Sequence, residues 1–165
     1  TLVSVEEYLH TSYDDGDREY VDGRVIERNL GEKDHSRTQR KLILYFGGQE
    51  ATLKTYAFPE QRIQVKPARF RVPDVCVYLG QEPREQVFRT PLFLAIEILS
   101  PEDRAADLQE KIDDYLAFGV PCVWVIDPRR HRAWTHTAQG SHEAKDRILR
   151  TANPEIQLPL DELFA

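Results

Sequence analysis

The sequence predicts a mixed α/β protein in which a central mixed β-sheet is flanked by helices and preceded by an N-terminal β-hairpin. Three observations predict this fold. Asp22-Gly23 stands between two alternating segments, the strongest short signal for a two-residue hairpin turn. Residues 92–99 are apolar on both faces except at one position, as in a strand that is covered on both sides. This strand, a helix over residues 101–118 and an apolar strand over residues 121–126 follow with short links, which is typical of a right-handed crossover.

Local signals predict the other elements in chain order. Ser4 and Glu7 form a capping box before a helix over residues 5–10, and a polar turn follows over residues 13–17. Asp34 can cap a helix over residues 35–53, in which Gly47-Gly48 marks close packing or a bend. The remaining expected elements are strands over residues 55–58, 60–65, 69–79 and 132–137, a strand over 142–149 that pairs with the last of these, and a short terminal helix from Pro159-Leu160-Asp161.

Length and composition narrow the class of protein. The 165 residues fit a single domain over residues 1–165 that can bury a proper core. The longest apolar run falls well short of the ~20 residues of a membrane span, so we expect no membrane association. Cys76 and Cys122 each lie in a predicted strand and are expected to be free and buried, which suits a reducing cytoplasm. The chain has no phosphate-cradling glycine loop, and Ser100 lacks the glycines of a nucleophile elbow.

The charge of the chain is unevenly distributed. The net charge of −6 argues against a protein that binds nucleic acid through bulk charge alone. Residues 33–71 nevertheless carry nine basic residues against three acidic ones, a charge of +6, which leaves −12 for the rest. Such a basic segment suits a phosphodiester substrate, although a solvated helix face and strand edges would give the same pattern.

Two carboxylates stand where apolar residues are expected. Asp74 lies in the strand over residues 69–79, and Glu97 is the one polar residue of the strand over residues 92–99. An ionised carboxylate in such a place is costly unless it is paired or binds a metal. Carboxylates on adjacent strands supply the oxygen ligands of a hard divalent cation, here Mg²⁺ or Mn²⁺, with the carbonyl of Ile98 as a further ligand.

The helix that follows adds a cation. Ser100 is a good N-cap and Pro101 suits the first helical position. At about 100° per residue, Arg104 and Lys111 lie on one shoulder of the buried stripe, where Lys111 can lay its ammonium group along the sheet. Without a metal, a buried salt bridge between Glu97 and either of these cations would explain the same residues.

Taken together, these residues resemble the PD-(D/E)XK nuclease superfamily, and most closely its Uma-type branch of restriction-endonuclease-like proteins. The similarity rests on Pro73-Asp74, on the strand with Glu97, and on Leu99-Ser100-Pro101 before a helix with Asp107 and Lys111. The segments Gly119-Val120-Pro121 and Trp124-Val125-Ile126-Asp127-Pro128 extend it, so that it covers roughly residues 5–163. One departure is clear, since the superfamily pattern places lysine two residues after the acid and this chain has Leu99 there.

The resemblance implies a restriction-endonuclease-like core and metal-assisted hydrolysis of a phosphodiester, with DNA as substrate. In the Uma-type branch the lysine is thought to have moved to the following helix, where it would be Lys111; we expect its pKa to fall if it is partly buried near the metal. Cutting both strands would favour a homodimer. The further candidates for the catalytic site are Glu19, His35 and Asp107, and the candidates for nucleic-acid binding in the basic segment are Arg37, Arg40, Lys41 and Arg71.

Two other functions remain open from the sequence. Leu99 at the usual lysine position favours a catalytically inactive module that keeps the fold and binds nucleic acid or protein. The acidic total charge favours a metal-dependent hydrolase of a small phosphorylated molecule. Salt dependence of binding separates these functions, because counterion release is steep for DNA and shallow for a small ligand.

Overall fold

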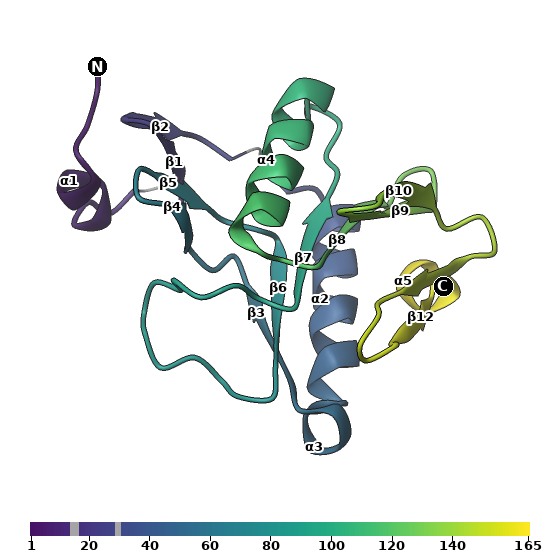
Figure 1. The fold of residues 1–165 in the computed structure, drawn as a ribbon. Helices are drawn as coiled ribbons and strands as arrows, with labels where there is room; N and C mark the ends of the chain where they lie inside the picture. The colour runs from purple at the N-terminus through teal and green to yellow at the C-terminus, as the bar shows by residue number, and fades with distance from the viewer. Residues whose placement is uncertain (14–16, 29–30) are drawn as a thin grey trace.

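The largest sheet of the protein has six strands. The computed structural model describes residues 1–13, 17–28 and 31–165, so the predicted turn over residues 13–17 falls largely outside the described residues (Figure 1). The strands are β3 (Thr55–Pro59), β6 (Val75–Leu79), β7 (Leu94–Ile98), β8 (Cys122–Asp127), β9 (Arg132–Thr137) and β10 (Gly140–Glu143). Their order in space is β10-β9-β8-β7-β6-β3. β7 and β8 run parallel, joined by a helix as predicted, and the other neighbours are antiparallel.

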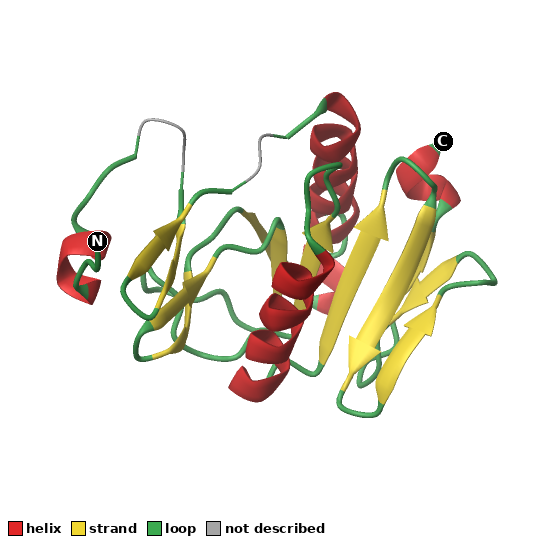
Figure 2. Ribbon diagram, turned by 90° about the horizontal axis from the view of Figure 1, so that it is seen from above, coloured by secondary structure: helices red, strands yellow, loops and turns green. Residues whose placement is uncertain are grey.

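Two helices cover this sheet, one on each face (Figure 2). They are α2 (Lys33–Gly47) and α4 (Ala105–Phe118). Leu42 and Phe46 of α2 pack in one buried cluster with alternate residues of β6, β7 and β8. Ile112 and Tyr115 of α4 pack in a second cluster with the intervening residues of the same strands. The prediction that both faces of the strand with Glu97 are covered is therefore confirmed, and both cysteines are free and buried.

A smaller four-stranded sheet holds the predicted hairpin. It consists of β1 (Glu19–Val21), β2 (Arg24–Ile26), β4 (Ile63–Lys66) and β5 (Arg69–Arg71), in the order β2-β1-β5-β4. Asp22 and Gly23 form the turn with φ of 51° and 94°, the positive values that a type I′ turn requires. The short helix α1 (Val5–Leu9) packs Tyr8 against Tyr20 of this sheet, and the Ser4 side chain accepts a hydrogen bond from the Glu7 N–H. The hairpin and the N-cap at Ser4 are thus confirmed.

The single strand expected over residues 69–79 is wrong. The segment divides into β5 and β6, which belong to different sheets. Pro73 lies between them and has no N–H to donate to a sheet ladder, so the chain leaves one sheet there and enters the other. Asp74 consequently stands just before β6, at the junction of the two sheets.

Both long helices also differ from their predicted bounds. The first begins at Lys33 with Glu32 as N-cap and ends at Gly47, and a separate turn of helix, α3 (Glu50–Leu53), follows it. The second begins at Ala105 and not at Pro101. The Asp103 carboxylate accepts a hydrogen bond from the Ser100 N–H at 2.8 Å, and a local turn held by such a side chain competes with the helix.

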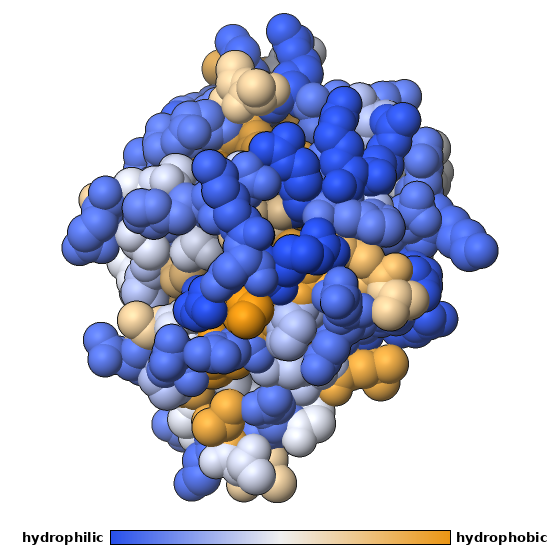
Figure 3. Space-filling view, turned by 90° about the vertical axis from the view of Figure 1, so that its right-hand side faces the viewer, coloured by the Kyte–Doolittle hydropathy of each residue, from blue (hydrophilic) through white to orange (hydrophobic). Residues whose placement is uncertain are grey.

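The C-terminal residues form a hairpin and a small separate sheet. β9 and β10 pair as expected, but the strand predicted over residues 142–149 is wrong, because a turn containing Arg147 at a φ of 65° interrupts it. β11 (Ile148–Arg150) instead pairs with β12 (Gln157–Pro159), and α5 (Asp161–Phe164) is the predicted terminal helix. The face on this side is mostly hydrophilic, with hydrophobic residues in separate patches (Figure 3). No helix in the described part of the chain has the length and apolar character needed to cross a membrane.

Candidate active site

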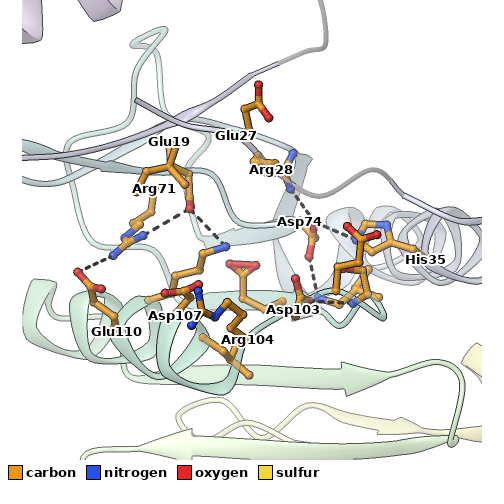
Figure 4. A pocket seen from close by; sticks show the side chains of 17 residues that line it. Glu19, Glu27, Arg28, His35, Arg71, Asp74, Asp103, Arg104, Asp107 and Glu110 are labelled. Atoms are coloured by element: carbon orange, nitrogen blue, oxygen red, sulfur yellow. Dashed lines mark hydrogen bonds and ion pairs between the residues drawn. The ribbon is translucent and has the colours of Figure 1, made fainter. Parts of the chain in front are cut away.

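A cavity of about 220 Å³ lies where the four-stranded sheet, the end of β7 and the first half of α4 meet (Figure 4). Eight aspartates and glutamates line it against four arginines and lysines, so the cavity is acidic. The residues predicted to be catalytic or to bind metal come from five separate segments of the chain, and all of them line it: Glu19, His35, Asp74, Glu97, Ile98, Asp107 and Lys111.

Asp74 and Glu97 lie opposite each other at the end of the β6–β7 pair. The register pairs Val75 with Ile96, and its continuation by one residue places Asp74 opposite Glu97. Opposite residues on antiparallel strands have Cβ atoms about 5 Å apart. The Ile98 N–H donates to Asp74 Oδ2 at 2.7 Å, which fixes this carboxylate against β7. The structure therefore brings the two predicted metal ligands together.

An arginine and a histidine hold the other oxygen of Asp74. Its Oδ1 lies 2.6 Å from a guanidinium nitrogen of Arg28 and 3.1 Å from Nε2 of His35. Burial disfavours the ionised form of Asp74, but the hydrogen bond from His35 and the charges of Arg28 and His35 outweigh it, so its pKa lies below the ordinary value. Burial likewise opposes charge on His35, yet Asp74 raises its pKa. Arg28 also donates to Glu60 at 2.7 Å.

Glu97 has a less compensated charge. It is 5% exposed, and burial raises its pKa to about 8. The charge of Lys111 opposes this rise, while the negative charges of Asp74 and Glu19 add to it. The Tyr115 hydroxyl donates to Glu97 Oε1 at 3.1 Å. In the metal-free protein Glu97 therefore holds a proton over much of the neutral range.

Lys111 reaches from α4 into the cavity. Its Nζ lies 3.3 Å from Oε1 of Glu19, and its side chain is 25% exposed. Burial favours the neutral amine, but the charges of Glu97, Glu19 and Asp74 outweigh burial, so the pKa of Lys111 is raised. The expected fall in this pKa is not seen in the metal-free chain, because three carboxylates act on the ammonium group. Asp107, one turn earlier, is exposed at the rim.

Glu19 is a buried part of the site. It is 1% exposed, and its Oε2 accepts a hydrogen bond from the Val72 N–H at 2.8 Å. Its Oε1 lies 3.4 Å from a guanidinium nitrogen of Arg71 in addition to Lys111 (Figure 4). Glu19 thus connects β1, the end of β5 and α4, and it holds the ammonium group of Lys111 at the cavity wall.

Behind this group, Asp114 of α4 anchors two arginines of β5. Its Oδ2 accepts from Arg71 at 2.8 Å and its Oδ1 accepts from Arg69 at 2.8 Å. Asp114 and Arg71 are each 3% exposed. The pair ties α4 to the four-stranded sheet and sets the position from which Arg71 contacts Glu19.

Arg28, Asp114 and Tyr115 were not predicted as site residues. Asp107, Lys111 and Asp114 are spaced i, i+4, i+7, so a polar side of α4 was visible in the sequence and could have indicated Asp114. Tyr115 lies on the buried apolar side of α4, and nothing in the sequence indicates that its hydroxyl bonds to Glu97. Arg28 contacts Asp74 across 46 residues of sequence, and no local pattern indicates that contact.

The residues predicted to bind nucleic acid lie elsewhere or are buried. Arg37 and Lys41 both donate to the carbonyl oxygen of Ala165, the latter at 2.7 Å. Arg40 is exposed, and none of these three lines the cavity. Arg71 lines it, is buried and is paired with Glu19 and Asp114.

A mixed sheet between two helices, with paired carboxylates at the end of adjacent strands, places the chain in a nuclease-like fold class. A crystal structure of a "putative nuclease belonging to DUF820" from Anabaena variabilis ATCC 29413 has the same fold, with a TM-score of 0.83. It matches over 98% of this chain and 97% of that chain at 22% sequence identity. The Uma2 family, described as "Putative restriction endonuclease", matches residues 5–163. This chain therefore belongs to the Uma2 family, as its sequence predicted, and no curated protein matches it.

Removal of the Asp114 carboxylate tests how the site is anchored. We expect Asp114→Asn to lower the free energy of unfolding by about 3 kcal/mol, because it removes the nearest counter-charge of the buried Arg71. Urea denaturation measures this change, and the neighbouring exposed Asp113→Asn is the matched control, with little expected effect. An equal effect of both substitutions would show that the buried pair does not anchor α4.

The raised pKa of Glu97 gives a pH dependence of stability. In the metal-free folded protein Glu97 keeps a proton that the unfolded chain releases near its ordinary pKa of 4.5. This contribution is complete below that pH and is lost as the pH rises through about 8. Relative to wild type, Glu97→Gln should therefore gain stability on the order of a few kcal/mol between low and high pH.

Urea unfolding in chelator across this pH range measures the difference. The control is Glu102→Gln, which removes an exposed acid from the same cavity and should follow the wild type. Parallel stability curves for Glu97→Gln and wild type would contradict the raised pKa.

Proposed function

We propose that this protein is a divalent-cation-dependent endonuclease that hydrolyses phosphodiester bonds in DNA. The observation that carries the proposal is the placement of Asp74 opposite Glu97 in an acidic cavity into which Lys111 reaches. The family description supports a nuclease, and the metal and the roles of these residues are our inference.

The donor set fits Mg²⁺ or Mn²⁺. Such ions bind through one or two carboxylates and keep several waters. Asp74 and Glu97 supply two carboxylates, and Ile98 lines the same cavity. In the described residues no group of three or more His, Cys, Asp and Glu side chains is arranged to hold a metal, so the protein would provide part of the coordination shell. Burial raises the pKa of Glu97 to about 8, and the negative charges of Asp74 and Glu19 add to the rise. A bound cation would stabilise the ionised form of Glu97 against both effects.

The residues that line the cavity have different roles in the proposed hydrolysis. When bound, the cation would supply activation of a water molecule and stabilisation of charge on the phosphoryl oxygens. Lys111 stays protonated because its pKa is raised, so it acts as a cation and hydrogen-bond donor toward the phosphoryl group or the attacking water, and not as a general base. Glu19 positions the ammonium group of Lys111. His35 orients Asp74, and Asp107 at the rim is a further candidate for positioning the water or Lys111.

Metal calorimetry with DNA nicking tests the proposal. We expect Asp74→Asn and Glu97→Gln to lose Mn²⁺ binding and to reduce plasmid nicking to background. Lys111→Met should keep Mn²⁺ binding and reduce nicking about 10²–10³-fold, since it removes one charge-stabilising group. Glu102→Gln, an exposed acid in the same cavity, should keep both.

The competing function is a catalytically inactive binding module, favoured by Leu99 and by the contacts of Arg28 and His35 that already hold Asp74. Mn²⁺ binding by wild type without nicking of any DNA would favour it. A folded wild type that binds no Mn²⁺ would rule out the proposed mechanism.

Arg28 should compete with the cation for Asp74. Its guanidinium lies 2.6 Å from Asp74 Oδ1, so a metal on that oxygen has to displace it or share the carboxylate with it. We expect Arg28→Gln to bind Mn²⁺ at least about tenfold more tightly, a gain of roughly 1.4 kcal/mol. Arg24→Gln removes an exposed arginine from the same hairpin and should leave the affinity unchanged. Weaker or equal Mn²⁺ binding by Arg28→Gln in calorimetry would show that Arg28 does not compete.

A further inference from the structure

A second cavity of about 290 Å³ adjoins the candidate active site. It lies between the segment that leads from β7 into α4 and the turn after β8. The two cavities share four lining residues, Ser100, Asp103, Arg104 and Leu108, so they lie on either side of one wall.

The second cavity is basic where the first is acidic. Arg104, Arg129 and Arg130 line it against Asp103 and Asp127. Asp127 is 5% exposed, and its carboxylate accepts hydrogen bonds from the N–H groups of Arg129 and Arg130. One of the two acids is therefore occupied in holding the turn. All three arginines are exposed, and the Arg130 side chain keeps 73% of its surface in solvent although it pairs with Asp127.

The sheet fixes the distance between the two cavities. β7 and β8 run parallel with Ile98 beside Ile126, so both strands end at the same edge of the sheet. Neighbouring strands are about 4.8 Å apart. The turn with Arg129 and Arg130 therefore begins one strand away from Glu97 and Ile98. Arg104, labelled in Figure 4, lines both cavities.

The charges at this edge of the sheet determine whether a nucleic acid can bind there. An acidic cavity repels a polyanion unless positive charge nearby attracts it. Of the basic residues predicted from sequence, Arg37, Arg40 and Lys41 line neither cavity. Arg71 is buried between Glu19 and Asp114.

We propose that the second cavity is the subsite for the nucleic-acid backbone next to the bond in the active site, with Arg104, Arg129 and Arg130 binding its phosphates. This inference rests on the proposed function and deepens it. A strand that places one phosphodiester at Asp74 and Glu97 continues over Arg104 into the basic cavity. Backbone contacts of this kind hold the register of the substrate and carry no sequence information.

Fluorescence anisotropy of a labelled DNA duplex tests the proposal without cleavage. The parent is the full chain with Glu97→Gln, measured in chelator over a series of salt concentrations. We expect the double variant Arg129→Gln/Arg130→Gln in this parent to bind at least about tenfold more weakly and to lower the salt slope by roughly one for each phosphate that the protein no longer neutralises. The matched control is Arg24→Gln/Arg84→Gln, which removes two exposed arginines that line neither cavity, changes the net charge equally and should alter affinity less than about twofold.

Three results would overturn the subsite: equal losses in both double variants, no loss in Arg129→Gln/Arg130→Gln, or no DNA binding by the parent. A shallow salt dependence that both variants share would point to a small phosphorylated ligand and would also overturn it. Mn²⁺ calorimetry on Arg129→Gln/Arg130→Gln with Glu97 intact should match the wild type and shows that the fold and first cavity are preserved. Failure of the nuclease proposal is separate, because it is read from Mn²⁺ binding and nicking in the Asp74 and Glu97 variants.

Discussion

Four carboxylates lie almost out of solvent in or just behind one cavity, and each of them needs a counter-charge, a set of donors or a proton. They are Glu19, Asp74, Glu97 and Asp114, each at most 5% exposed. A buried ionised carboxylate without compensation is too costly to persist. The elements that meet at the cavity are arranged so that arginine, lysine and histidine side chains from other segments reach these acids. The docking of the small sheet onto α4 and onto the end of β7 depends on that pairing.

Nearby cations and hydrogen-bond donors do not stabilise these carboxylates equally, and the difference appears in their pKa values. Asp74 is held by Arg28, His35 and a main-chain donor, and its pKa is lowered. Glu97 lies next to it with a raised pKa, because burial and the neighbouring acids outweigh the charge of Lys111. The ionised form of Glu97 is therefore less stabilised than that of Asp74, and a divalent cation beside it would stabilise it.

Sequence reasoning could predict those parts of the site that depend on local pattern. Asp22-Gly23 specifies its turn directly, and Glu97 stands out because every neighbour on both faces of its strand is apolar. The position of Lys111 followed from helical periodicity, although the helix starts four residues later than predicted. The strand-favouring residues on both sides of Pro73 could not show that this proline separates two sheets. It also could not show the contacts of Arg28 with Asp74 or of Arg71 with Asp114, which join residues 46 and 43 positions apart.

The placement of lysine on α4 follows from the two-residue period of β7. A residue two positions after Glu97 points to the same face of the sheet, which is the face that α4 covers. In this chain that position is Leu99, and it packs with the apolar residues beneath α4. Lys111 approaches the same face from the helix side, and the charges of Glu97 and Asp74 both act on it. A lysine at the position of Leu99 and the observed Lys111 would therefore lie on the same side of the acid pair, which supports the role proposed for Lys111.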